Sequence, residues 1–345
     1  MIVPLLAASS DSSPAENPRE LGKVNWGRNL NQALVQSKST GKPVALLFQE
    51  IPGCATCVNF GRDVLSHPLL VDALEHEFVP LAIHNNKPGE DAAVLKRFNE
   101  PAWNNPVLRL IDADGRDLIA RKDGVWSPGG IAQRMITALE AADRSVPAYL
   151  RLAAAELGAA TPERATFAMH CFWDGEAKLG GIDGVLSTRA GWMDGHEVVE
   201  ITFDSRTVTY VKLLDQAQQM QCATAVFAQS DSQFTTASKS PGSVVKRTND
   251  RARDTKTEDR KFALRQSPMR FLPLTPIQAA RVNADLRFGR DAQRWLSPSQ
   301  VGLLSQINAL LKADLSALDH LNPDEIETNP SQYEAKLNAA LRRAP

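Results

Sequence analysis

The spacing of hydrophobic and polar residues predicts a first block of mixed strands and helices. Residues 44–48 read VALLF, an unbroken apolar run that is typical of a strand buried on both faces. Further apolar runs predict strands at 78–83 and 106–111, and residues 118–121 are expected to pair back across a turn. Helical spacing is found at 29–37, 58–65 and 129–141. These elements define a first domain over residues 21–143.

A second pattern follows a helical connector at residues 144–162. Over residues 163–229, strand and helix signals alternate in the order β-α-β-β-α-β, the order of the split βαβ or ferredoxin-like arrangement. Residues 230–265 are rich in Ser, Thr, Lys, Arg and Asp and predict a solvated basic linker. Helices are then expected at 277–288 and at 333–343, and a third helix between them is expected to begin at a capping box that starts with Ser297. Residues 230–345 are therefore expected to be a basic linker and a helical C-terminal region.

Composition and charge exclude several classes of protein. Of 345 residues, 43% are hydrophobic and 23% are charged, as in ordinary globular proteins, and roughly 150 residues per domain predicts two domains with a tail. Lys plus Arg total 39 and Asp plus Glu total 40, so no nucleic-acid partner is expected. The apolar runs are too short to span a bilayer. Residues 1–20 are expected to be a flexible leader or a signal-peptide remnant, because MIVPLLAA precedes a polar stretch.

The chemistry of the chain is concentrated in its four cysteines, which are Cys54, Cys57, Cys171 and Cys222. They are too few for a disulfide scaffold in a chain of this length. Cys54 and Cys57 form a C-x-x-C pair between a buried strand and a helix, whose free N–H groups and dipole favour a thiolate. Cys54 is then the nucleophile, and Cys57 resolves the mixed disulfide. A zinc half-site and inert core thiols are the alternatives, although a zinc site needs further ligands, such as a second C-x-x-C or paired histidines.

This first block resembles the thioredoxin-like superfamily, in its disulfide-reductase-associated branch. The matching pieces are Trp26, GKPV at 41–44, CATC at 54–57 and Asn105-Pro106. The resemblance implies that Pro106 follows a cis peptide bond and lies opposite the active site, beside the substrate. The Ile-Pro-Gly-Cys lead-in is also similar to a thioredoxin-like family in which selenocysteine can occupy the first position.

A second strand-to-helix junction places Cys171 directly before two aromatic residues. The segment 169–176 reads MHCFWDGE, so the N-terminus of the following helix favours a thiolate at Cys171 as well. The aromatic rings of the next two residues can hold a methyl-thio group. GVLSTRAGW at 184–192 and GHEVVEITFD at 195–204 follow it. This string resembles the peptide-methionine (S)-S-oxide reductases, the A-type methionine sulfoxide reductases, whose motif is G-C-F-W-x-x-E, S-T-x-x-G-Y and H-A-E. The resemblance covers residues 164–229.

The resemblance implies a role for each matched residue. Cys171 attacks the sulfoxide sulfur and is left as a sulfenic acid, which a second thiol condenses to a disulfide. Phe172 and Trp173 hold the methyl group, and Glu176 is a further substrate-binding residue. Glu197 protonates the sulfoxide oxygen, which requires a carboxyl group with a raised pKa.

The sequence departs from the family motif near these residues. His170 replaces the motif's glycine, His196 abuts the glutamate without the intervening alanine, and the loop before it is shortened to 193–195. The alignment places Cys222 at the family's second substrate tyrosine, so Cys222 is predicted to resolve Cys171; a buried small hydrophobe is the alternative. Two other interpretations of this domain are a degenerate relic of the enzyme that only keeps the fold, and a metal site. The metal site would be formed by His170, Cys171, His196 and Cys222.

The predicted fold is an α/β thioredoxin-like domain followed by a ferredoxin-like α+β, methionine sulfoxide reductase A-like domain. We expect a thiol redox enzyme that reduces peptide methionine-S-sulfoxide at Cys171 with electrons from Cys54 and Cys57, without cofactor or metal. Its partners are expected to be oxidised proteins or free methionine sulfoxide, with an upstream dithiol reductant. The alternatives are a thiol–disulfide oxidoreductase with a degenerate second domain and a non-enzymatic redox-sensing or binding module. The apolar N-terminal segment favours the periplasm or cell envelope over the cytoplasm.

Overall fold

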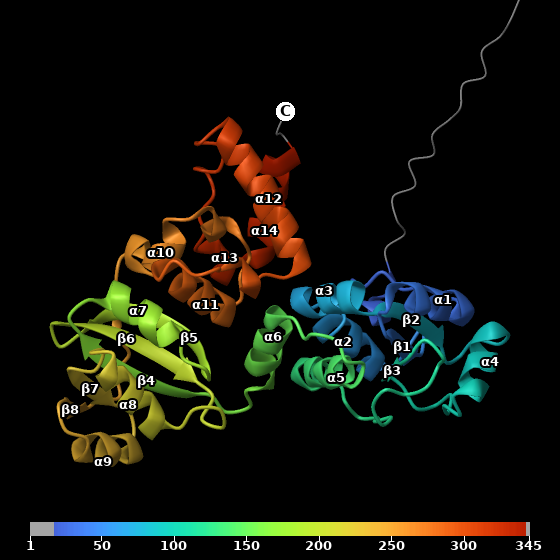
Figure 1. Cartoon of the computed structure of the whole chain (residues 1–345), viewed down its shortest axis with the longest axis horizontal. Coiled ribbons are helices and arrows are strands. Elements are labelled where there is room, and N and C mark those ends of the chain that lie inside the picture. Colours follow the sequence, from blue (N-terminus) through green and yellow to red (C-terminus); the bar gives the residue numbers. More distant parts are fainter. Residues whose placement is uncertain (1–16, 343–345) are drawn as a thin grey trace, which may run out of the picture. The chain divides into compact units, whose positions relative to one another are not determined.

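The computed structural model describes residues 17–342, which form two compact units that meet in sequence between Ser127 and Pro128 (Figure 1). Residues 1–16 of the expected leader lie outside the described residues. Residues 17–20, also expected to be flexible, belong to the first unit, because η1 (Arg19–Leu21) follows and the Glu20 side chain is buried. In the described part of the chain, no helix combines the length and the apolar character that crossing a bilayer requires.

The first unit contains a three-stranded sheet in the order β2-β1-β3. Its strands are β1 (Val44–Gln49), β2 (Val79–His84) and β3 (Val107–Ile111). Its helices are α1 (Leu30–Thr40), α2 (Ala55–Asp63), α3 (Pro68–Glu77) and α4 (Glu90–Arg97). Strand β1 pairs parallel with β2 and antiparallel with β3, and every residue of β1 is buried, as its apolar run predicts. The strands predicted at 44–48, 78–83 and 106–111 are confirmed, and the buried β1 leads into α2.

The return strand expected at residues 118–121 is wrong. Beyond β3 the chain forms an isolated bridge between Ile111 and Asp117 instead of a strand. The Leu118 N–H donates to the Leu110 carbonyl, and the Asp112 N–H donates to the Arg116 carbonyl. The cause lies in Arg109, whose side chain is buried in β3 and pairs with Asp117 and Glu100. A buried guanidinium needs carboxylate partners. The chain after β3 therefore follows ion pairs rather than a strand ladder.

The second unit begins with α5 (Pro128–Ala141) and α6 (Ala148–Gly158), which pack against each other. The sequence assigned residues 129–141 to the first domain, whereas the compact units place α5 with the second. The other predicted domain boundaries stay predictions.

The second unit then follows the predicted order of strands and helices. In chain order these are β4 (Glu163–Met169), α7 (Phe172–Gly180), β5 (Val185–Met193), β6 (His196–Phe203), α8 (Tyr210–Gln219) and β7 (Ala225–Ala228). The sheet has six strands in the order β8-β7-β4-β6-β5-β9, and its four inner strands pair antiparallel. Phe172 of α7 and Leu213 of α8 share one core with Phe167 of β4, so both helices cover the same face.

Residues 230–265 are not a solvated linker, which corrects the prediction. They form α9 (Asp231–Lys239), β8 (Val244–Arg247), β9 (Arg253–Asp254), η2 (Thr257–Asp259) and α10 (Phe262–Arg265). Strands β8 and β9 extend the sheet at its two edges. Basic residues of this segment pair with acidic residues, as Arg251 does with the buried Glu200. The segment is held by these charge pairs, which hydropathy does not detect.

The helical C-terminal region is confirmed. Its longer helices are α11 (Pro276–Arg287), α12 (Pro298–Ala313) and α14 (Pro330–Arg342), with the short η3 (Pro268–Phe271), η4 (Gln293–Trp295) and α13 (Glu325–Thr328) between them. Thr275 forms a complete capping box at the start of α11, and Ser297 does so at the start of α12. Both α11 and α12 have a proline in the first turn. The Tyr333 hydroxyl, fully buried, donates to the Phe271 carbonyl at 3.0 Å.

Candidate functional site

The loop after β1 delivers Cys54 to the N-cap of α2. This loop contains a cis bond between Ile51 and Pro52. A Cβ atom at Gly53 would lie 2.6 Å from the Cys57 Cβ, so only glycine allows the loop to approach the helix this closely. The Gly53 N–H donates at 2.7 Å to the carboxylate of Glu20, which is buried. The loop is therefore held from both sides.

The two thiols of the first unit lie side by side but differ in exposure. Their sulfur atoms are 3.7 Å apart; Cys54 is exposed, and Cys57 is fully buried. The Cys57 thiol donates to the Asn105 side-chain oxygen at 2.6 Å. The bond from Asn105 to Pro106 is cis, as predicted. The residue next to the cis proline thus contacts the dithiol directly.

Electrostatics separate the roles of the two thiols. A hydrogen bond from the Cys57 backbone N–H lowers the pKa of Cys54. Burial acts against it, and further hydrogen bonds to Cys57 and Thr56 lower the pKa again. Burial raises the pKa of Cys57 to about 11, reinforced by its neighbour Cys54. Cys54 is therefore the thiol that ionises first, which suits a nucleophile with a buried resolving partner.

Glu50 adds a third potential metal ligand beside this dithiol. Its carboxylate and the two sulfurs lie within 4.8 Å of one another, and within residues 17–342 this is the only such group of three or more His, Cys, Asp or Glu. The zinc half-site considered from the sequence thus gains one ligand, whereas a closed structural zinc site requires four. The potential ligand atoms of His170, Cys171, His196 and Cys222 do not form such a group.

Cys171 occupies the corresponding position in the second unit. It is the N-cap of α7, directly after β4, and it is half-buried. Glu197, at the start of β6, pairs with Met169 at the end of β4. Its carboxylate accepts a hydrogen bond of 2.7 Å from the Phe172 N–H, in the first turn of α7. The carboxylate therefore lies beside the residue that follows the cysteine.

Aromatic rings line this junction. Phe172 is buried and packs edge-on against Trp192, with ring centroids 5.7 Å apart, whereas Trp173 is 37% exposed. A Cβ atom at Gly175 would lie 1.8 Å from the Met169 sulfur, so the glycine leaves room for the Met169 side chain between α7 and the end of β4. Three predicted residues, Cys171, Phe172 and Glu197, are thus adjacent, with Trp173 at the surface.

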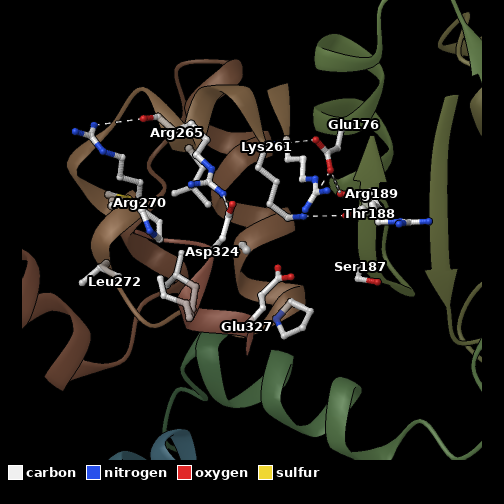
Figure 2. A pocket seen from close by; sticks show the side chains of 18 of the residues that line it. Glu176, Ser187, Thr188, Arg189, Lys261, Arg265, Arg270, Leu272, Asp324 and Glu327 are labelled. Carbon is white, nitrogen blue, oxygen red and sulfur yellow. Dashed lines mark hydrogen bonds and ion pairs between the residues drawn. The ribbon is translucent and has the colours of Figure 1, made fainter. Parts of the chain in front are cut away.

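Glu176 has a different setting. It is fully buried, and its two oxygens accept hydrogen bonds from the Thr188 hydroxyl at 3.2 Å and the Lys261 backbone N–H at 2.6 Å. It lines a cavity of about 480 Å³ between the sheet and the C-terminal segments, where Arg265 also pairs with Asp324 (Figure 2). Cys171, Trp173 and Glu197 do not line that cavity. The carboxylate is occupied by structural partners, and its role in substrate binding stays a prediction.

Cys222 lies between α8 and β7 and is buried. Burial raises the pKa of its thiol to about 11. The antiparallel register of β4 with β7, continued past the strand ends, would set Cys222 opposite Cys171. The pairing shifts there, because the Thr224 N–H donates to the Ala168 carbonyl. Cys222 as the resolving thiol therefore stays a prediction.

Several residues at the two sites were missed by sequence reasoning. They are Glu20 and Glu50 in the first unit, and Asp259, Lys261 and Phe262 in the second. The acidic pair sits close to the C-x-x-C in space, and only Glu50 is also close in sequence. No motif marked the other three, since they lie in the segment interpreted as a linker.

Comparison with known proteins identifies the fold of the first unit. Residues 25–113 match a family model described as thioredoxin-like, so the first unit contains a thioredoxin-like domain. Among solved structures, a DsbH oxidoreductase aligns at 22% identity and a TM-score of 0.30, covering 39% of this chain and 95% of that chain.

Part of the chain is also similar to curated peptide methionine sulfoxide reductases, named MsrA. The protein from Methanothermobacter thermautotrophicus is 43% identical over 70 residues, which cover 15% of this chain and 41% of the relative. That from Methanococcus maripaludis is 36% identical over 73 residues, covering 16% and 46%. That from Geobacter sulfurreducens is 41% identical over 69 residues, covering 15% and 43%. The chain therefore spans less than half the length of these relatives, and a thiol redox role is the function that both comparisons support.

The two thiols of the first unit should alkylate with different pH profiles. Because the pKa of Cys54 is lowered, its thiolate fraction should reach one half at a lower pH than in an ordinary thiol, whereas Cys57 should follow only near pH 11. Iodoacetamide labelling of the reduced Cys171→Ser/Cys222→Ser protein, with mass spectrometry to locate the label, measures both profiles. Two indistinguishable profiles centred near 8.5 would contradict the asymmetry.

Proposed function

We propose that this chain is a thiol redox enzyme that reduces methionine sulfoxide at Cys171 with electrons from the Cys54–Cys57 dithiol. The observation that carries the proposal is the contact of the Glu197 carboxylate with the first turn of α7, whose N-cap is Cys171. A nucleophilic thiol and a proton donor are the two groups that the reaction needs. The similarity to MsrA proteins and the ferredoxin-like order of the inner strands support the same assignment.

The first step transfers oxygen from the sulfoxide to the enzyme. The Cys171 thiolate attacks the sulfoxide sulfur, and Glu197 donates a proton to the sulfoxide oxygen. The sulfur–oxygen bond of the substrate breaks, and Cys171 is left as a sulfenic acid. The substrate leaves as a thioether. One thiol and one sulfoxide thus give one sulfenic acid and one thioether, a two-electron exchange.

The second step returns Cys171 to its thiol. Another thiol, Cys222 in our prediction, condenses with the sulfenic acid to form a disulfide and one water. Cys54 attacks that disulfide, and Cys57 then displaces the mixed disulfide and closes with Cys54. The net result is oxidation of one dithiol, which an upstream dithiol reductant restores. Because the two units share one chain, their effective concentration is on the order of mM without any fixed interface.

The second candidate is a thiol–disulfide oxidoreductase that acts on other proteins through the first unit alone. Its support is the exposed Cys54, whose pKa is lowered, within a thioredoxin-like domain. In that case the second unit would contribute substrate docking rather than chemistry.

Two assays on matched cysteine variants distinguish these functions. With dithiothreitol as reductant, Cys171→Ser should abolish turnover of N-acetylmethionine sulfoxide and leave insulin disulfide reduction intact. Cys54→Ser should do the reverse, because dithiothreitol can reduce Cys171 directly. Insulin reduction without sulfoxide turnover in the unsubstituted protein would favour the second candidate, and the absence of both activities would exclude both.

Removing the proton donor should slow the first step. Glu197→Gln keeps the shape and the hydrogen-bond acceptor for the Phe172 N–H but cannot supply the proton, so sulfoxide turnover should fall about 10²- to 10⁴-fold. Insulin reduction by the same variant is the control, since it depends on the other unit. Turnover at the unsubstituted rate would remove Glu197 from the mechanism.

Cys222 should be required for regeneration. After a single turnover, mass spectrometry should find a Cys171–Cys222 disulfide, which requires Cα atoms about 4.4–6.8 Å apart when it forms. Cys222→Ser should accumulate the Cys171 sulfenic acid instead, trapped with dimedone. A variant that regenerates as fast as the unsubstituted protein would show that Cys54 reduces Cys171 without Cys222.

A further inference from the structure

A short segment of the C-terminal region lies against the motif residues of the second unit. We call residues 253–262, from β9 to the start of α10, the strap. Arg253 pairs with Trp192 across the β5–β9 ladder. Asp259 and Phe262 both contact Trp173. Lys261, between them, contacts Glu176. The strap therefore reaches three residues in or directly beside the reductase motif.

Two of these contacts hold the Trp173 indole. Its ring N–H donates to the Asp259 carboxylate at 3.1 Å, and the other oxygen of that carboxylate accepts from the Thr255 hydroxyl at 3.3 Å. The ring itself is stacked on Phe262, with centroids 4.2 Å apart and planes inclined by 14°. The edge and one face of the indole are thus both fixed. Trp173 nevertheless stays 37% exposed, so part of the ring is open to a ligand.

Lys261 anchors the strap one residue before the stacked ring. Its backbone has a φ of 46°, a left-handed conformation that is costly for a residue with a side chain. In this conformation its N–H donates to the buried Glu176 at 2.6 Å, and its ammonium group donates to the Thr188 carbonyl at 2.8 Å (Figure 2). Such a backbone persists only where its surroundings hold it. The position of Phe262 is therefore determined by bonds to α7 and β5.

We propose that the strap completes the substrate pocket at Cys171, with Asp259 and Phe262 as positioning residues that hold Trp173 as a wall for the substrate's methyl-thio group. The inference rests on the proposed function. Only Asp194 and Gly195 connect β5 to β6, and β9 of the strap pairs with β5 at Gly191 and Trp192. A wall fixed on two sides favours a methyl group over a larger alkyl group, because an apolar pocket discriminates through the space it leaves.

Variants of the two positioning residues test this role. Phe262→Ala and Asp259→Ala should each raise the KM for N-acetylmethionine sulfoxide about 3- to 10-fold with little change in kcat, since the wall binds ground and transition states alike. The preference in kcat/KM for methionine sulfoxide over ethionine sulfoxide should fall severalfold in the same variants. Phe262→Tyr keeps a stacking ring and should restore both values. Phe288→Ala is the matched control, because Phe288 is 42% exposed in the same unit and outside the strap.

Three kinetic outcomes would overturn the proposal. An unchanged KM in Phe262→Ala would show that the strap contributes nothing to substrate binding. A lowered KM would show that it obstructs the pocket instead. An equal loss of kcat in Phe262→Ala and Phe262→Tyr, with the methyl preference intact, would show that Phe262 acts on folding alone.

A measurement that does not depend on turnover separates this inference from the proposed function. Acrylamide quenches the fluorescence of accessible tryptophan side chains. The quenching measured for each protein, after subtraction of the quenching in the same protein with Trp173→Phe, reports the accessibility of Trp173. It should rise about two- to threefold in Phe262→Ala, where one ring face is uncovered. If the unsubstituted protein has no sulfoxide turnover, the proposed function fails. In that case N-acetylmethionine sulfoxide should still reduce the quenching of Trp173 by acrylamide in the unsubstituted protein and in Phe262→Tyr, but not in Phe262→Ala. If the sulfoxide does not reduce the quenching in the unsubstituted protein, the role of the strap is overturned.

Discussion

Both thiol sites depend on one arrangement, a buried strand that is followed within a few residues by the first turn of a helix. Cys54 is the N-cap between β1 and α2, and Cys171 is the N-cap between β4 and α7. In the described structure neither side chain is used to cap its helix, so each sulfur stays available at the positive end of the helix dipole. Strands that lie within packed sheets fix the position of each cysteine. The chemistry therefore begins from rigid elements rather than from mobile loops.

Close packing at these junctions brings the remaining groups within reach. Gly53 and Gly175 each occupy a place where a Cβ atom would collide with a neighbouring side chain. The first glycine lets the loop contact Cys57, and the second lets α7 lie on the end of β4. Asn105 and Glu197 then reach their junctions from other strands or loops of the same unit. The sites are assembled from short local turns together with one distant polar residue each.

Charge pairs decide the structure of the region after β7. Glu200 and Glu176 are buried acids, and each needs a cationic or N–H partner to offset the cost of leaving water. Arg251 and Lys261 provide those partners from the C-terminal side of the sheet. The strap follows Arg251 and contains Lys261, so these pairs attach it to the sheet and to α7. A composition typical of solvated linkers thus gives an ordered edge strand and the covering of Trp173.

The sequence by itself predicted the buried strands of the first unit, the β-α-β-β-α-β order of the second and the cysteines at both junctions, and the thioredoxin-like resemblance added the cis bond before Pro106. These follow from local periodicity and from motifs whose residues are adjacent in the chain. It also placed Glu197 near Cys171, because the motif carries that pairing. Only the tertiary structure decided the failure of the return strand, the fold of residues 230–265 and the stacking of Phe262 on Trp173. Those features arise from ion pairs and ring contacts between residues far apart in the chain, which hydropathy and spacing do not encode.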